Sequence, residues 1–134
     1  MLVRIYYEDT DAGGVVYYAN YLKFLERCRT EWLRAIGADQ ADLLRDLRIA
    51  FVVRSVSLEY LKPARLDDLI RIDLNVEKIS RTQVFFAQHI WREHPEMCRE
   101  ALIDAKIRVV CVDALRMKVV AFPPSLRGVF PEIQ

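Results

Sequence analysis

The stretch NYLKFLERCRTEWLRAIG occupies residues 20–37 and contains the clearest periodic pattern in the chain. Its apolar residues recur at steps of three and four, the spacing that places side chains on one face of an α-helix. Asn20 is a favoured N-cap residue, and Gly37 stands where a glycine commonly ends a helix. The pattern therefore predicts a long helix from Asn20 to about Ile36. Its apolar stripe consists of Tyr21, Phe24, Leu25, Cys28, Trp32 and Ile36.

Outside this helix, apolar residues mostly alternate with polar ones, the period of a half-buried β-strand. Thr82–Trp91 is apolar on both faces and is expected at the centre of a sheet, between turns at Lys78–Arg81 and Glu93–Glu96. Four consecutive strands without helical crossovers imply an antiparallel sheet. The expected α+β architecture is one long helix wrapped by a curved five-stranded antiparallel sheet, in a single domain over residues 1–134. The predicted strands are Leu2–Tyr7, Phe51–Leu61, Ile70–Glu77, Thr82–Trp91 and Ala101–Cys111, with a second, shorter helix at Ala41–Leu47.

The strand Phe51–Leu61 carries one charge that does not fit its pattern. Val52, Val56 and Leu58 are predicted to share one face. Arg54 falls on the same face, where a charge requires a partner or an interface.

Surplus apolar surface predicts self-association. One sheet face and one helix form a thin core for this many aliphatic residues, and the strand that is apolar on both faces leaves further surface to cover. A homodimer is the simplest way to bury it, and a homotetramer remains open.

The composition is that of an ordinary globular domain. Of the 134 residues, 53% are hydrophobic, and 20 basic residues nearly balance 19 acidic ones, which argues against a nucleic-acid-binding protein. No apolar run approaches the roughly 18 residues of a membrane span, and the N-terminal residues do not resemble a signal peptide. Cys28, Cys98 and Cys111 are odd in number and far apart, which excludes a fully paired intrachain disulfide set and a CxxC metal site. A cytoplasmic protein with reduced thiols and no metal is expected.

The segment Glu8–Asn20 contains the most reactive combination of residues. Three carboxylates, Glu8, Asp9 and Asp11, precede a glycine-bearing turn that leads into the predicted helix. Backbone N–H groups at a helix N-terminus can bind a developing oxyanion, and a nearby carboxylate can act as general base or nucleophile. By spacing alone, an acidic turn that only caps the helix remains the commoner interpretation.

The two histidines offer little for nucleophilic catalysis. His89 and His94 flank the fourth predicted strand, and the chain has neither a Ser-His-Asp nor a Cys-His arrangement. Both are interpreted as structural or solvated side chains.

Residues 4–21, RIYYEDTDAGGVVYYANY, resemble the signature of hot-dog-fold acyl-CoA thioesterases. The resemblance is strongest to the YbgC branch, which is associated with the Tol–Pal gene cluster, and extends to the 4-hydroxybenzoyl-CoA thioesterases. It continues at residues 24–31, 50–54, 59–68 and 110–113, and so covers nearly the whole chain. It implies a hot-dog fold, in agreement with the predicted architecture, and the hydrolysis of an acyl-CoA thioester without a cofactor.

The resemblance also implies roles for individual residues. Asp11 matches the catalytic carboxylate of the family, which either activates water or attacks to form a mixed anhydride, and Asp9 is expected to hold the loop through backbone hydrogen bonds. Typical YbgC proteins have histidine at the position of Tyr18. The 4-hydroxybenzoyl-CoA branch has tyrosine there, and its backbone N–H polarises the thioester carbonyl.

Substrate-binding residues follow from the same resemblance. Arg81 matches a basic hairpin that contacts the phosphates of CoA, and Lys62 and Arg65 are weaker candidates for the same role. Each has a simpler alternative, a solvated charge at a turn. The apolar residues Val15, Val16, Tyr17 and Tyr21 could line an acyl or aromatic pocket, or belong to the core.

Two other functions compete with hydrolysis. A non-catalytic module that binds an acyl thioester or an acyl carrier protein would have the same backbone. A hot-dog hydratase or dehydratase is less favoured, because that chemistry generally needs a histidine paired with an acidic residue and the Asp11 motif contains none.

Overall fold

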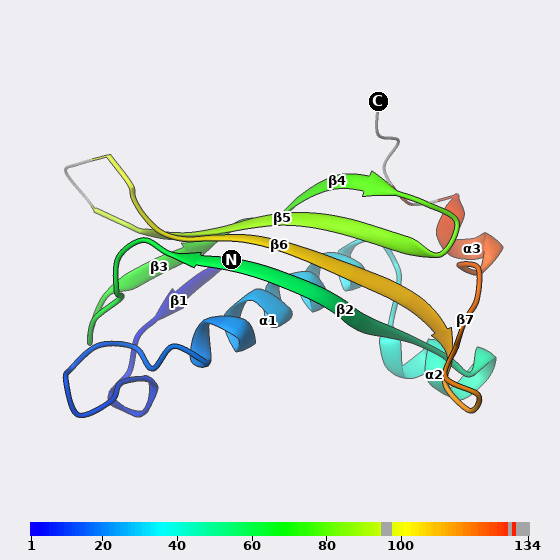
Figure 1. Ribbon diagram of the computed structural model, residues 1–134, viewed down its shortest axis with the longest axis horizontal. Coiled ribbons are helices and arrows are strands. Elements are labelled where there is room, and N and C mark those ends of the chain that lie inside the picture. The colour runs from blue at the N-terminus through cyan, green and yellow to red at the C-terminus, as the bar shows by residue number, and fades with distance from the viewer. Residues whose placement is uncertain (95–97, 129, 131–134) are drawn as a thin grey trace.

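The computed structural model describes residues 1–94, 98–128 and 130. A long helix, α1, lies along one face of a curved antiparallel sheet (Figure 1). The strands are β1 (Leu2–Arg4), β2 (Ile49–Tyr60), β3 (Leu69–Ile72), β4 (Asn75–Ile79), β5 (Gln83–Arg92), β6 (Glu100–Asp113) and β7 (Lys118–Val119). The helices are η1 (Tyr7–Asp9), α1 (Asn20–Ala35), α2 (Gln40–Leu47) and α3 (Pro124–Arg127). No helix in this part of the chain is both long and apolar enough to cross a bilayer.

The main path of the sheet has the strand order β1-β3-β5-β6-β2, with every neighbouring pair antiparallel. The two remaining strands are short additions, since β4 pairs with β5 beyond β3 and β7 pairs with β6. The predicted hot-dog architecture is therefore confirmed. Strand β5 has neighbours on both edges, as its two apolar faces predict.

The predicted strand Ile70–Glu77 is divided at Asp73. The Asp73 carboxylate accepts the backbone N–H of His89 at 2.8 Å and the indole N–H of Trp91 at 2.9 Å. Because this side chain occupies donors on β5, the ladder is interrupted there, and β3 ends at Ile72 before β4 begins at Asn75.

Helix α1 begins differently from the prediction. Asn20 is its first helical residue rather than its N-cap, which is Ala19, and the Asn20 amide instead donates to the Asp9 carbonyl at 2.9 Å. The predicted end is confirmed, because Gly37 has a φ of 94° and donates its N–H to the Arg34 carbonyl at 3.0 Å. The buried residues of the helix are Tyr21, Phe24, Leu25, Cys28, Arg29 and Leu33.

A bulge in β2 corrects the predicted faces of this strand. The register with β6 shifts between Val53 and Ser55, so Arg54 is an extra, exposed residue that needs no buried partner. Val52 and Val56 consequently face opposite sides of the sheet, and the predicted shared face is wrong at Val52. The face toward α1 carries Ile49, Phe51, Val53, Val56, Leu58 and Tyr60.

Strand β2 lies at one edge of the sheet. Among the strands described, it pairs only with β6, which leaves the other edge of this 12-residue strand open. Val53 and Val56 on it are each 43% exposed. Long edge strands with exposed apolar residues are prone to pair with another chain.

Candidate active site

Residues 10–19, which we call the Asp11 loop, connect η1 to α1. Asp9, just before this loop, bonds to residues on both sides of it. Its carboxylate accepts the N–H of Tyr6, before η1, at 2.9 Å, and its carbonyl accepts the N–H of Tyr17, near the end of the loop, at 3.1 Å. Its carbonyl also accepts from the Asn20 side chain at the start of α1. The expectation that Asp9 holds the loop by hydrogen bonds is therefore confirmed.

Asp11 lies exposed in a tight turn. Its Oδ1 accepts the N–H of Gly13 at 2.8 Å, and its carbonyl accepts the N–H of Gly14 at 3.1 Å. Gly14 has a φ of 77°, and a Cβ at Gly13 would lie only 3.2 Å from Asp11 Oδ1. The two glycines therefore allow the turn to close on one carboxylate oxygen while Oδ2 has no protein donor in the described structure.

The start of α1 offers free backbone donors next to this turn. In the part of the chain described, no protein acceptor pairs with the N–H groups of Tyr18 and Ala19. The Tyr18 carbonyl accepts from the Tyr60 hydroxyl at 3.4 Å, and the Tyr18 side chain is 60% exposed. Unpaired N–H groups at the first turn of a helix carry a partial positive charge that favours an anion.

The Asp11 loop rests on a second loop, residues 61–68, between β2 and β3. The N–H of Val16 donates to the Ala64 carbonyl at 2.8 Å, and the Ala64 N–H donates to the Tyr21 hydroxyl at 2.9 Å. Val15 and Arg65 form an isolated β-bridge beside these contacts. The position of Asp11 consequently depends on where the 61–68 loop is held.

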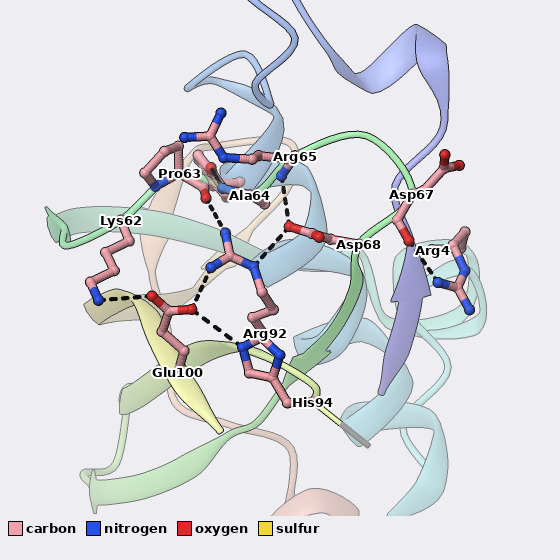
Figure 2. Close-up of polar contacts among 11 residues, drawn as sticks. Arg4, Lys62, Pro63, Ala64, Arg65, Asp67, Asp68, Arg92, His94 and Glu100 are labelled. Atoms are coloured by element: carbon pink, nitrogen blue, oxygen red, sulfur yellow. Dashed lines mark hydrogen bonds and ion pairs between the residues drawn. The ribbon is translucent and has the colours of Figure 1, made fainter. Parts of the chain in front are cut away.

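Arg92, at the end of β5, holds that second loop (Figure 2). Its guanidinium donates to the Pro63 carbonyl and to the carboxylates of Asp68, at 2.9 Å, and Glu100. Lys62 pairs with Glu100 at 2.8 Å. Hydrogen bonds from Lys62, Arg92 and His94 lower the pKa of Glu100 to about 2. We call Arg92, Asp68, Glu100 and Lys62 the Arg92 network.

The predicted binding residues near Asp11 are found in different settings. Lys62 belongs to the Arg92 network, whereas Arg65 is exposed beside Val15. Val16 is only 4% exposed and is a core residue, the simpler of its two predicted roles. Tyr17 is 47% exposed, and its ring centroid lies 4.8 Å from that of Tyr18. It is therefore a surface residue of the Asp11 loop, next to the start of α1.

Arg81 is not brought to this place within one chain. It is exposed in the turn between β4 and β5, and its carbonyl accepts the Phe122 N–H at 3.0 Å. Figure 1 shows this turn near α3, at the opposite end of the sheet from the loop that precedes α1. A single protomer thus separates the predicted phosphate contact from the predicted catalytic carboxylate.

The end of the molecule that carries Arg81 also contains a mostly apolar cavity of about 90 Å³. It lies between α1 and the sheet, and its walls include the apolar side chains of Leu33, Phe51, Val53, Phe86 and Phe122 and the polar ones of Glu26, Arg29, Thr30 and Gln40. Sequence reasoning missed Arg29, although a signal was present. Arg29 stands four residues from both Leu25 and Leu33, which places it on the apolar stripe.

The histidines occupy structural positions on the sheet. The His89 ring lies between two carboxylates, with Nδ1 at 3.1 Å from Asp73 and Nε2 at 2.7 Å from Asp104, and His94 contacts Glu100. No cluster of metal-ligating side chains is present in the described residues. Within one chain, the candidate site therefore consists of the Asp11 carboxylate and the free backbone donors at the start of α1, while the cavity lies at the other end of α1.

Comparisons with known proteins point to one family. The thioesterase superfamily matches residues 13–99. An acyl-CoA thioesterase YbgC of Haemophilus influenzae is 42% identical over 132 residues, covering 98% of this chain and 93% of its own. An acyl-CoA thioester hydrolase YbgC of Escherichia coli O6:H1 is 45% identical over 130 residues, covering 97% of this chain and 93% of its own.

Solved structures agree with this assignment. A probable thioesterase from Bartonella henselae superposes with a TM-score of 0.81 at 32% identity, covering 92% of this chain and 97% of its own. The 4-hydroxybenzoyl-CoA thioesterase from Pseudomonas sp. strain CBS-3 superposes with a TM-score of 0.87 at 19% identity, covering 97% of this chain and 96% of its own. At that identity the second likeness concerns the fold alone.

Proposed function

This chain belongs to the thioesterase superfamily and is an acyl-CoA thioesterase, and we propose that it hydrolyses its substrate with Asp11 and the backbone at the start of α1. The observation that carries the proposal is that one short loop holds an exposed carboxylate and, where the loop enters α1, unpaired backbone N–H groups. Asp11 has a free oxygen, and the N–H of Tyr18 has no protein acceptor in the described residues.

The proposed chemistry requires the thioester carbonyl oxygen to face the N–H of Tyr18. Negative charge that develops on this oxygen is stabilised by the preorganised helix terminus, without reorganisation of solvent. Asp11 then takes a proton from an attacking water, or attacks the carbonyl carbon itself and forms a mixed anhydride that water hydrolyses. In either route the CoA thiolate leaves as the tetrahedral intermediate collapses, and the acid is released.

We also propose that the working unit is a homodimer formed along the open edge of β2. Antiparallel self-pairing about the middle of β2 brings its Phe51 end beside the Tyr60 end of a second copy. Tyr60 contacts Tyr18 of the Asp11 loop, whereas Phe51 lines the cavity at the Arg81 end. Each Asp11 loop would then lie beside the cavity and the Arg81 turn of the other protomer, which supports Arg81 as a contact for the CoA phosphates.

We also propose a cellular location for the protein and a second possible acyl donor. Cys28, Cys98 and Cys111 are all free, which suits the reducing cytoplasm. An acyl carrier protein presents its acyl group on the same phosphopantetheine arm as CoA, so it is a second candidate partner for the same site.

Release of free thiol from a panel of short, long and aromatic acyl-CoA thioesters tests the function. Wild-type protein should hydrolyse at least one class, and the Asp11→Asn variant should be nearly inactive with normal affinity for CoA. A wild-type protein that binds these thioesters without hydrolysing any of them would instead be the non-catalytic binding module.

A further inference from the structure

The cavity beneath α1 contains a charge that the proposed mechanism does not use. Arg29 is only 9% exposed, and its Nη1 donates to Oε1 of Gln88 at 2.9 Å. Gln88 is fully buried and donates its own amide to the Leu25 carbonyl at 3.1 Å. No carboxylate of the described residues lies within ion-pairing distance of the Arg29 guanidinium.

A buried guanidinium with one protein acceptor is energetically unfavourable. The group has five N–H donors, and a buried cation without an ion-pair partner is destabilising. Burial accordingly lowers the pKa of Arg29. The wall of the cavity also includes Glu26, Thr30 and Gln40, which hydrogen-bond to one another. In the described structure none of them hydrogen-bonds to the Arg29 guanidinium, so its remaining N–H donors are available to an acceptor that enters the cavity.

The cavity lies where an acyl group would arrive. It reaches the edge strand through Phe51 and Val53. In the proposed β2 dimer this end of the strand adjoins Tyr60 of the partner copy, and with it the Asp11 loop that would hold the thioester carbonyl. An acyl chain that extends from that carbonyl would therefore enter the cavity of the other protomer.

We propose that this cavity binds the acyl group of the thioester held by the partner protomer, and that Arg29 selects acyl groups with an oxygen acceptor at their far end. The proposal rests on the proposed function and its dimer. A volume of about 90 Å³ is smaller than the roughly 150 Å³ of a benzene-binding cavity, so the acyl group is short. Its polar end is a neutral carbonyl or hydroxyl, or a carboxylate, and both satisfy the same donors.

Three acyl-CoA thioesters of equal chain length test the selection. Pentanoyl-CoA has an apolar end, 4-oxopentanoyl-CoA a neutral acceptor and glutaryl-CoA an anionic one. Wild-type kcat/KM should be at least about tenfold higher for one of the two polar substrates than for pentanoyl-CoA, the size expected for a hydrogen bond to a charged group. Equal kcat/KM for all three would overturn the proposal.

Substitutions at two arginines of α1 test whether Arg29 causes the preference for polar acyl groups. Arg29→Met keeps most of the length of the side chain without its charge, and should remove the preference by slowing the polar substrate much more than pentanoyl-CoA. Arg27→Met, an exposed arginine on the same helix, should leave all three rates unchanged. An equal loss on polar and apolar substrates in well-folded Arg29→Met would contradict a selective role.

Arg29→Met leaves Gln88 without its donor, so folding must be measured by circular dichroism. If that variant does not fold, Arg29→Lys serves instead, because it retains the charge but not the planar fork, and should reduce the preference without abolishing it. An unchanged preference in well-folded Arg29→Lys would then overturn the proposal.

Mixing two variants tests whether the residues meet across protomers. In a heterodimer of Asp11→Asn and Arg29→Met, one of the two sites combines the intact Asp11 of one chain with the intact Arg29 of the other. Activity on the preferred polar substrate should therefore rise when the two proteins are mixed and allowed to exchange subunits. Activity equal to the mean of the separate proteins would show that Arg29 does not act on the partner's site.

Binding measurements separate this inference from the proposed function. Thioether analogues of the three substrates cannot be hydrolysed, and calorimetry should show the same ranking of Kd for wild type and Asp11→Asn. If no thioester is hydrolysed but the ranking of Kd persists, the hydrolytic function fails and the acyl subsite stands. If thioesters are hydrolysed but the three Kd values agree, the acyl subsite fails and the function stands.

Discussion

The two ends of α1 differ in how their charged side chains are paired. At its N-terminal end, the Asp11 loop is exposed, but the charges behind it are fully paired through the Arg92 network (Figure 2). Toward its C-terminal end, the cavity wall is mostly apolar, and the buried Arg29 guanidinium has only an amide oxygen as acceptor in the described structure. The first end is held in place before substrate arrives, whereas the second has free donors that a ligand can use. In the proposed dimer each end forms half of a site, and pairing along the open edge of β2 joins the two halves.

The largest expected effect is at Asp11. Asp11→Asn preserves the shape of the turn but removes the base or nucleophile, and should lower kcat by about 10²–10⁴. Asp67→Asn is a matched control, since Asp67 is an exposed carboxylate on the supporting loop. Steady-state thiol release measures both variants. Retention of more than half of the wild-type kcat by Asp11→Asn would contradict the proposed mechanism.

The second prediction separates the two halves of the site. Val56→Lys puts an inward-pointing charge in the middle of the open edge of β2, a device that prevents edge pairing. We expect a monomer in sedimentation equilibrium and a loss of activity of about a hundredfold, because the reacting groups are no longer positioned together. Val119→Lys changes a similarly exposed valine on β7 and should remain dimeric and active. A monomer with full specific activity would refute the shared site.

The third prediction concerns the framework behind Asp11. Arg92→Met leaves the carboxylates of Asp68 and Glu100 without their shared cation, and should destabilise the protein by about 3 kcal/mol. Arg45→Met, which removes two exposed ion pairs on α2, should change stability much less than Arg92→Met. Urea denaturation at neutral pH measures both variants. Equal effects would show that the Arg92 network stabilises the protein no more than exposed surface ion pairs do.

The Arg92 network also predicts that the free energy of unfolding depends on pH. In the folded protein the pKa of Glu100 is about 2, below its ordinary value of 4.5. Its ion pairs therefore stabilise the folded state above about pH 4.5, and this contribution is lost as the pH falls toward 2. The difference in unfolding free energy between wild type and Glu100→Gln should accordingly shrink across that range.

A smaller effect is expected at the opposite end, at Arg81. Arg81→Ala should raise KM for CoA thioesters much more than it lowers kcat, because a phosphate contact binds the ground and transition states alike. The effect should diminish on a pantetheine thioester that lacks the nucleotide phosphates. Arg116→Ala, an exposed arginine in the β6–β7 turn, serves as the control. An equal loss on both substrates would exclude a phosphate contact.

The smallest effect is expected at Tyr18, if its backbone N–H is the relevant group. Tyr18→Phe and Tyr18→His should then keep kcat/KM within about tenfold of wild type, or under about 1.4 kcal/mol. A hundredfold loss in well-folded Tyr18→Phe would instead assign the oxyanion contact to the phenol. Thermal melts of both variants establish that folding is intact.

The regular elements of the fold were predictable because their signals are local. Helix α1 follows from apolar residues at steps of three and four, and the strands follow from alternation, with Gly37 ending the helix as expected. The departures arise where a side chain or an extra residue changes a long-range pairing. Asp73 takes donors of β5 and divides a strand, and Arg54 adds a bulge that reverses the facing of Val52.

The elements, the helix-and-sheet architecture and the position of Asp11 before a helix N-terminus follow from the order of residues alone, because they depend on neighbours in the chain. The folded chain was needed to show that the Arg81 turn and the cavity lie at the far end from the Asp11 loop, that Arg92 holds the supporting loop and that Arg29 is buried. Those facts depend on contacts between residues far apart in sequence, such as Arg29 with Gln88, and no local pattern encodes which partners meet.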